Sequence, residues 1–335
     1  MSQDIHLSID AMGGDQGPRL VVLASLAFLK SHPDVNVTLV GDESQIKAHL
    51  PALVDSTIES RVAIQHACEQ VSVHEKASEA LRNKQNSSMW KAVSLVAEGE
   101  ADACVSAGNT GALMAFGVKL IGTFEGVRRP AICKKVPTLK GASFLLDLGA
   151  NINCSAAQLV QFAIMGSALA QIHGVEKPQL ALLNIGAEWS KGGDAILDAA
   201  HQLKASKGLD FTGFIEGHEL YSGKVDVVVC DGLVGNVALK VSEGMAGFVF
   251  SSLNRSFNAS WWNRIAGWLL KPVLKNWRDE FNPSLYNGAA FLGLHKTVVK
   301  SHGSADQLGF EHALAVAVEQ VRGDISARIG NCLKN

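Results

Sequence analysis

The side chains best suited to chemistry begin with a short loop of small and polar residues, Ser106–Gly111, with the sequence Ser-Ala-Gly-Asn-Thr-Gly. Gly108 and Gly111 let the backbone turn tightly, while Asn109 and Thr110 offer polar side chains where a helix is expected to begin. Free N–H groups at a helix start favour an anion, so the loop indicates a phosphate site. A capped turn with Thr110 as its N-cap explains the same residues equally well. The loop has neither the lysine of a P-loop nor the spacing of a dinucleotide-binding fingerprint.

Two further candidates are a lysine and an asparagine that follow apolar, strand-like runs. Lys191 lies in a loop after Gln179–Asn184, where it could hold a phosphate or an oxyanion as a point charge. Most surface lysines have no such role. Asn236 stands between Gly235 and a helical run beginning at Val237, and its amide could donate to a developing oxyanion or simply cap the helix. From these residues alone both assignments stay open.

Polar residues also gather around single glycine turns at two other places. The segment Lys300–Asp306 holds a cation, hydroxyls, an imidazole and an acid, so His302 and Ser304 could bind an anion. A polar turn capped by one of its own side chains is the alternative. Asp10 and Asp15 could bind a metal, but acids in such turns more often accept hydrogen bonds from the backbone. The sequence has no zinc-ligand spacing, and we expect no metal site.

The elements that must position these loops are short strand-like runs alternating with helical patterns, which predicts an α/β protein. Strands are expected at Ile5–Asp10, Val35–Val40, Ala103–Ser106, Ser143–Leu148 and Gln179–Asn184, and helices at Leu20–Lys30, Ser44–Leu50, Thr110–Ile121, Gln158–Ile172, Asp194–Lys204 and Phe310–Ile329. We expect a mostly parallel sheet covered by helices, in a single domain over 1–335. Ligands of such sheets bind at the carboxyl ends of the strands, so the loops at 10–15, 106–111, 147–151, 184–186 and 231–236 predict one crevice.

Composition sets limits on the function. With 335 residues, 47% hydrophobic content and a formal net charge of −2, the chain can bury a large core and shows no overall attraction to nucleic acid. The six cysteines form no Cys-x-x-Cys pair and are expected to be reduced core residues. The N-terminus has no signal-like stretch, and no apolar run of about 20 residues is free of charges or proline. These patterns predict a cytoplasmic protein that does not span a membrane.

Eight stretches in order along the chain carry a family resemblance: Ile9–Asp15, Ser87–Met89, Glu100–Met114, Arg129–Ala131, Leu146–Asn151, Leu182–Gly186, Asp231–Val237 and Lys300–Ser304. As a set they resemble the bacterial phosphate acyltransferases that make acyl phosphate for phospholipid synthesis, over essentially the whole chain. The resemblance implies a dimeric α/β fold related to isocitrate and isopropylmalate dehydrogenases and to phosphotransacetylase. It also implies that no cofactor is needed.

The resemblance further implies a reaction and its residues. Orthophosphate would attack the acyl thioester on acyl carrier protein, and a membrane glycerol-phosphate acyltransferase would consume the acyl phosphate. The family's catalytic lysine and asparagine fall on Lys191 and Asn236. Lys191 would orient phosphate and Asn236 would stabilise the oxyanion, with Asp10, His302 and the other polar residues named above lining the phosphate site. His302 as proton donor to the leaving thiolate is a weaker hypothesis.

Four residues depart from the pattern that the family usually shows. Asn86 stands where an acid commonly precedes Ser87, and Phe214 replaces a usual asparagine. Ala187 and Trp189 flank Glu188 in a run that is typically richer in acids. The departures therefore concern the contacts near Lys191 rather than Lys191 itself.

Residues 248–281 form the strongest compositional outlier, a tryptophan-rich and basic helical excursion. Between Arg255 and Arg278 there are five basic residues, no acid and four of the six tryptophans. This mixture suits a membrane interface, for which we select five residues: Trp261, Trp262, Ile265, Trp268 and Leu269. The stripe could instead pack on its own domain or across a dimer, or dock the acidic carrier protein. A peripheral position on the inner face of the cell membrane follows from the first alternative.

Two other functional classes remain compatible with the sequence. A metal- and NAD-dependent decarboxylating dehydrogenase of the related fold would use acids near strand ends, such as Asp147 and Asp231, but the chain has no recognisable nicotinamide fingerprint. A non-catalytic scaffold that tethers carrier protein to the membrane would bind without turnover and would not depend on Lys191.

Overall fold

The computed structural model describes residues 4–51, 55–270 and 282–334. In the described chain an 11-stranded sheet runs through the whole molecule in the order β3-β2-β1-β4-β11-β10-β5-β6-β9-β7-β8. The strands are β1 (Ile5–Asp10), β2 (Val35–Gly41), β3 (Val62–His66), β4 (Ala103–Ser106), β5 (Ala131–Thr138), β6 (Gly141–Leu146), β7 (Gln179–Leu183), β8 (Asp210–Ile215), β9 (Val227–Val229), β10 (Ala289–Leu292) and β11 (Thr297–Lys300).

The sheet is mostly parallel, as the sequence predicts, with an antiparallel centre that it does not predict. Strands β3, β2, β1, β4 and β11 are parallel neighbours, and so are β6, β9, β7 and β8. Between these two groups, β11, β10, β5 and β6 pair antiparallel. The carboxyl ends of both parallel groups therefore bring their loops toward this centre.

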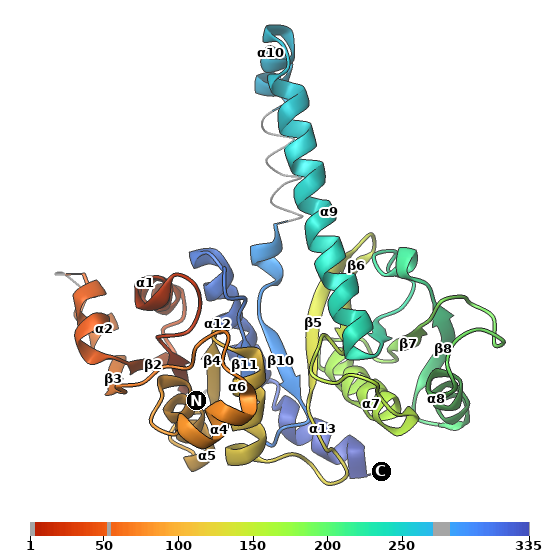
Figure 1. The fold of residues 1–335 in the computed structure, drawn as a ribbon, viewed down its shortest axis with the longest axis horizontal. Helices are drawn as coiled ribbons and strands as arrows, with labels where there is room; N and C mark the ends of the chain where they lie inside the picture. Colours follow the sequence, from red (N-terminus) through yellow and green to blue (C-terminus); the bar gives the residue numbers. More distant parts are fainter. Residues whose placement is uncertain (1–3, 52–54, 271–281, 335) are drawn as a thin grey trace.

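Helices cover both faces of the sheet (Figure 1). They are α1 (Gly17–Ser31), α2 (Glu43–His49), α3 (Ser56–Glu59), α4 (Ala77–Asn83), α5 (Ser88–Glu98), α6 (Thr110–Phe116), α7 (Ala156–Ile172), α8 (Asp194–Ala205), α9 (Gly232–Asn258), α10 (Trp261–Leu269), α12 (Gln307–Arg322) and α13 (Ile325–Lys334). A π-helical turn, Gly117–Ile121, continues α6, and short 3-10 turns lie at Gly217–Glu219 and Pro283–Tyr286. Where one helix was expected at Phe310–Ile329, the chain breaks between α12 and α13, because Asp324 has a φ of 48°.

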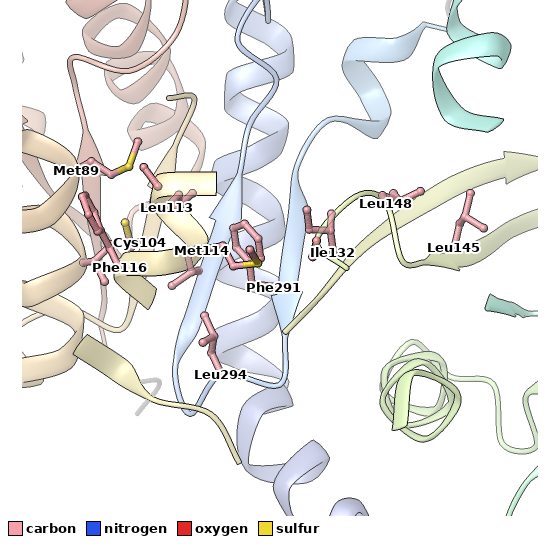
Figure 2. Packing of buried hydrophobic residues seen from close by; sticks show 14 of the residues in the cluster. Met89, Cys104, Leu113, Met114, Phe116, Ile132, Leu145, Leu148, Phe291 and Leu294 are labelled. Atoms are coloured by element: carbon pink, nitrogen blue, oxygen red, sulfur yellow. The ribbon is translucent and has the colours of Figure 1, made fainter. Parts of the chain in front are cut away.

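Alternating residues along the strands separate the hydrophobic core into clusters on opposite faces. Ala103 and Val105 of β4 pack with α1 and α12, whereas Cys104 between them packs with α5 and α6. Figure 2 shows the cluster that contains Cys104, which extends from Met89 and Phe116 toward Leu145 and Leu148 near the antiparallel centre. This continuous packing fixes the strand ends on which the loops depend.

The cysteines are free, but two of them are not core residues. Cys104, Cys133, Cys154 and Cys230 are buried as expected. Cys68 and Cys332 are exposed, which corrects the expectation that they lie in the core.

Helix α9 stands away from the sheet and ends at α10 (Figure 1). By length and composition alone it is long and apolar enough to cross a membrane, and 6% of its most apolar window is buried. The sequence did not suggest this, because Lys240, Glu243 and Arg255 interrupt the apolar run.

Helix α10 exposes the side chains selected as an interface. Trp268 is 72% exposed, Trp261, Trp262 and Ile265 are also exposed, and the rings of Trp261 and Trp262 stack with centroids 3.6 Å apart. The side chain of Leu269 and the later basic residues of the excursion, from Lys271 to Arg278, lie outside the described part of the chain.

Candidate active site

The buried carboxyl group of Asp10 organises the first loop from behind. Ser88 Oγ donates to Asp10 Oδ1 over 2.6 Å and Ser106 Oγ donates to Oδ2 over 2.7 Å. Ser106 Oγ in turn accepts the N–H of Gly108 over 3.0 Å. Burial raises the pKa of Asp10, and these hydroxyl donors oppose the rise. Asp10 and Ser106 therefore support the glycine-rich loop and do not line the cleft in front of it.

The N-cap of α6 is Asn109, not Thr110. Asn109 Oδ1 accepts the N–H of Ala112 over 3.0 Å, and the two N–H groups of its Nδ2 are shared among three carbonyl oxygens of a distant segment, those of Ser72, Val73 and Glu75, at 2.8–3.1 Å. The Asn109 amide is thus committed to fixing the loop. The loop offers its backbone and Thr110 to a ligand, rather than this side chain.

A second buried carboxyl group, that of Asp147 after β6, builds a matching loop. Its oxygens accept five N–H groups, from the backbone of Ile132, Leu148, Ala150 and Asn151 and from Asn151 Nδ2, over 2.7–3.2 Å. Burial raises the pKa of Asp147, and the hydrogen bonds from Asn151, Ile132 and Ala150 oppose the rise. The backbone of 147–151 is consequently held rigid at the strand end.

Asn236 lies on this loop, in the first turns of α9. Asp231 caps the helix by accepting the N–H of Leu233 over 2.9 Å, and a Cβ at Gly235 would lie 2.0 Å from the carbonyl oxygen of Asp147. Glycine at 235 therefore permits the close approach that sets the Asn236 side chain against Gly149. Among the described residues, the side-chain amide of Asn236 has no hydrogen-bond partner, which leaves it available to a ligand.

Lys191 occupies the loop after β7 and is exposed. Asn184 Nδ2 donates to the carbonyl oxygen of Lys191 over 2.9 Å, and Gly192 follows with a φ of 105°. A Cβ at Gly192 would lie 2.5 Å from Asn184 Oδ1, so the loop requires glycine there. Because β7 and β9 are parallel neighbours, Lys191 and Asn236 leave the same edge of the sheet on adjacent loops.

A cleft of about 430 Å³ lies between the two groups of loops. It is lined by Gly108, Asn109, Thr110, Gly111, Asp15, Asn236 and His302, by Lys300 from the Lys300–Asp306 segment, and by three residues that the sequence did not single out, namely Lys134, Lys240 and Glu243. Ser304 lines an adjoining pocket of about 320 Å³, which shares Lys134, Glu243 and His302 with the cleft. Lys191 is not among the residues that line either space.

Two of the cations that line the cleft, Lys134 and Lys240, form ion pairs with the same acid. Glu243 pairs with Lys240 over 2.8 Å and with Lys134 over 3.7 Å. Lys240 and Glu243 lie one and two turns beyond Asn236 on α9, whereas Lys134 comes from β5. Burial lowers the pKa of Lys134. Both members of its ion pair with Glu243 line the cleft.

His302 is held in a neutral, accepting arrangement. Its Nε2 lies 3.0 Å from the Lys240 ammonium, which has only donors, and its Nδ1 lies 2.8 Å from Ser304 Oγ. Desolvation first, and Lys240 second, lower the pKa of His302. The N–H of Ser304 also donates to Nδ1 over 3.2 Å, so both ring nitrogens face hydrogen-bond donors. The lowered pKa gives little support to His302 as the acid for a leaving group.

The described residues contain no cluster of three or more His, Cys, Asp or Glu side chains arranged to hold a metal ion. The carboxyl oxygens of Asp10 and Asp147 accept hydrogen bonds from neighbouring hydroxyl and N–H groups of the protein.

Comparison with known proteins decides the family. The chain matches the family described as fatty acid synthesis protein over residues 5–328. A phosphate acyltransferase from Teredinibacter turnerae is 59% identical over 333 residues, which cover 99% of this chain and 100% of the relative. The chain belongs to the phosphate acyltransferase family. Another phosphate acyltransferase, from Saccharophagus degradans, is 54% identical over 98% of this chain and 96% of its own length. The protein is therefore an acyltransferase enzyme of lipid synthesis.

Solved structures confirm the fold expected for a phosphate acyltransferase. A phosphotransacetylase from Streptococcus pyogenes superimposes with a TM-score of 0.64 at 16% identity, covering 96% of this chain and 95% of that one. An isocitrate dehydrogenase from Methylococcus capsulatus gives a TM-score of 0.51 at 9% identity, covering 96% and 88%.

Two residues that depart from the usual phosphate acyltransferase pattern contact each other. The rings of Trp189 and Phe214 meet edge to face with centroids 5.2 Å apart, and Lys204 lies over the Trp189 ring at 4.9 Å. Trp189 belongs to the loop that carries Lys191. The paired aromatic residues therefore anchor this loop to β8 and α8.

Proposed function

We propose that this protein transfers a fatty acyl group from acyl carrier protein to inorganic phosphate and releases acyl phosphate. The observation that carries the proposal is the free side-chain amide of Asn236 in a cation-lined cleft, beside the loop that bears Lys191. An anionic nucleophile needs a cation beside it, and a carbonyl group that becomes an oxyanion needs a hydrogen-bond donor such as this amide. Membership of the phosphate acyltransferase family gives the acceptor its identity.

The reaction can be written with the chain's own residues. An oxygen of HPO₄²⁻ attacks the thioester carbonyl carbon, and the carbonyl electrons move to its oxygen. The Asn236 amide donates to this oxyanion, while the Lys191 ammonium orients the phosphate and balances its charge. When the carbon–oxygen double bond reforms, the carbon–sulfur bond breaks and the carrier thiolate leaves.

The proton balance of this step closes without an added acid. HPO₄²⁻ releases one proton when it becomes acyl phosphate, and the carrier thiolate takes up one proton to become the thiol. His302 would then shape the anion site with Ser304 and Lys240 rather than supply a proton. No covalent enzyme intermediate is required, because the thioester is already activated.

One assay tests the proposal directly. The protein is incubated with an acyl-carrier thioester and phosphate, without metal or nicotinamide, and both free carrier thiol and hydroxylamine-trappable acyl phosphate are measured. We expect both products in equal amounts. Lys191→Ala and Asn236→Ala should each lower the rate by about 100-fold or more, as loss of an oxyanion-stabilising donor does.

The same assay separates the competing functions. A scaffold would bind the carrier and release no thiol, and a dehydrogenase of this fold would act only with metal and nicotinamide. Full activity in both Ala variants would refute the assigned roles. Exposed Lys207→Ala serves as the matched lysine control.

We also propose that α10 holds the enzyme to the inner face of the cell membrane. The support is the exposed row of Trp261, Trp262, Ile265 and Trp268 at the far end of α9, beside basic residues. Replacing Trp261, Trp262 and Trp268 by Ala should reduce cosedimentation with anionic liposomes. Unchanged cosedimentation would remove the proposal. A membrane glycerol-phosphate acyltransferase would then receive the product there.

A homodimer would cover the apolar stripe of α9. Val237, Val241, Met245 and Phe248 are all exposed at helical spacing, and Val241 and Phe248 are each 62% exposed. Val241→Lys together with Met245→Lys should shift sedimentation from dimer to monomer. A wild-type monomer in solution would contradict this part of the proposal.

The acidic carrier protein would dock near the basic rim of the cleft.

A further inference from the structure

We propose that Lys300 binds the orthophosphate in the cleft and sets the enzyme's affinity for it. This inference rests on the proposed function and adds a residue to it, since neither the family motif nor the expected catalytic pair assigns a role to Lys300. Three observations carry the inference: the position of the ammonium group, its lack of a counter-ion, and its place on the wall of the cleft.

Lys300 lies where two of the loops diverge. It is the last residue of β11 and pairs in register with Ser106, the last residue of β4, which in turn pairs with Asp10. Its Nζ donates to the carbonyl oxygen of Ala107 over 3.1 Å and also to that of Ser301. The ammonium group is therefore fixed between the glycine-rich loop and the His302 loop.

This half-buried cation donates only to neutral acceptors. Among the described residues no carboxylate forms an ion pair with Lys300, and Asp10 and Asp15 act on it from a distance. The Asp10 oxygens are already occupied by Ser88 and Ser106. Withdrawal from water lowers the pKa of Lys300 to about 8. A cation removed from water without a counter-ion is unfavourable, so an anion arriving beside it would be bound strongly.

The cleft leads an anion to this point. Lys300 lines it together with Gly108, Thr110 and Gly303. An ammonium group has three N–H donors, and the two carbonyl contacts leave one for a ligand. Phosphate is the nucleophile that the proposed reaction requires, and it is compact enough to lie between the two loops.

Phosphate binding and kinetics test the inference on the full-length enzyme. In Lys300→Met we expect the Kd for inorganic phosphate, measured by calorimetry without the acyl substrate, to rise roughly 10- to 100-fold, as loss of one charge-assisted hydrogen bond implies. The KM for phosphate should rise equally, with little change in the KM for the thioester. Lys296→Met, an exposed lysine on the same β10–β11 turn, is the matched control and should change neither.

A purely structural role is distinguished by the conservative variant and by pH. Lys300→Arg keeps the charge and should restore most of the affinity for phosphate. Above pH 8 the wild-type KM for phosphate should rise by up to about tenfold per pH unit as Lys300 loses its proton, while in Lys300→Arg it should not. The groups facing Lys300 are Asp10, Asp15, Lys240 and His302, and the Arg variant leaves them all in place.

Every result decides one of the two claims. An unchanged phosphate Kd in a folded Lys300→Met variant would overturn the inference. Equal increases in both KM values, with no difference between the Met and Arg variants, would assign Lys300 to holding the loops and would overturn it as well. A wild type that binds phosphate through Lys300 yet forms no acyl phosphate would instead refute the proposed function.

Discussion

Replacing each of the two buried carboxylates by its amide should separate their structural contributions. Asp147 accepts only N–H groups, three on Oδ1 and two on Oδ2, and four of these five donors are backbone groups that cannot turn away. In Asp147→Asn the new NH₂ group must face at least two of these donors. Each lost charge-assisted bond costs about 1.5 to 3 kcal/mol, so the variant should lose about 3 to 6 kcal/mol of unfolding free energy.

Asp10→Asn provides the matched comparison within the same protein. Its two close partners are the hydroxyl groups of Ser88 and Ser106, which can rotate and accept a hydrogen bond from the new NH₂ group. We therefore expect a smaller loss, about 1 to 2 kcal/mol.

Urea unfolding followed by circular dichroism measures both values. Since a domain is stable by only about 5 to 15 kcal/mol, the Asp147 variant should also show a clearly lower midpoint. It should lose acyl transfer even where it remains folded, because the 147–151 loop supports Asn236. An equal loss in the two variants, or a larger one for Asp10→Asn, would refute the argument from fixed and rotatable donors.

Three further predictions follow from single contacts. Trp189→Ala, which removes the edge-to-face contact with Phe214, should lower acyl transfer several-fold and raise proteolysis of the Lys191 loop, whereas Trp189→Phe should preserve both. Asn109→Ala, which removes an N-cap and three carbonyl contacts, should lower the unfolding free energy by about 1 to 3 kcal/mol in urea titrations, and Asn109→Asp should not fully restore it because it has no donor. The folded-state pKa of Lys300 lies below its unfolded value, so the phosphate-free protein should gain up to about 3 kcal/mol of unfolding free energy between pH 8 and pH 10.5, a gain absent in Lys300→Met.

Strands β1, β2, β4, β6 and β7 were predictable because their apolar runs are short and end in turn residues. The bounds of β1 and β4 agree residue for residue with the expected ranges. Strand β5, and with it the β5–β6 hairpin, was not predicted because Lys134, Lys135 and Pro137 interrupt the apolar pattern of β5, whereas β6 was expected two residues later, at Ser143–Leu148. The break after α12 was also missed, although Gly323 and Asp324 are weak helix formers, because apolar residues at helical spacing continue on both sides of them.

Part of the candidate site was predictable for the same reason, because loops at strand ends can be recognised locally. Lys134 and Lys240 could not be recognised, since a lysine in a strand or on a helix face is normally solvated. Their ion pairs with Glu243 join β5 to α9 and exist only in the folded chain. The structural role of Asn109 was hidden too, because its acceptors lie 34 to 37 residues earlier in the chain.

The length of α9 sets the distance between the cleft and α10. The helix carries Asn236 near its first residue and reaches α10 at its other end, 27 residues in all. At a rise of about 1.5 Å per residue it is about 40 Å long, comparable to the full thickness of a bilayer. A membrane held by α10 would therefore lie far from the cleft, and the product of the proposed reaction would have to cover that distance before it reached lipid.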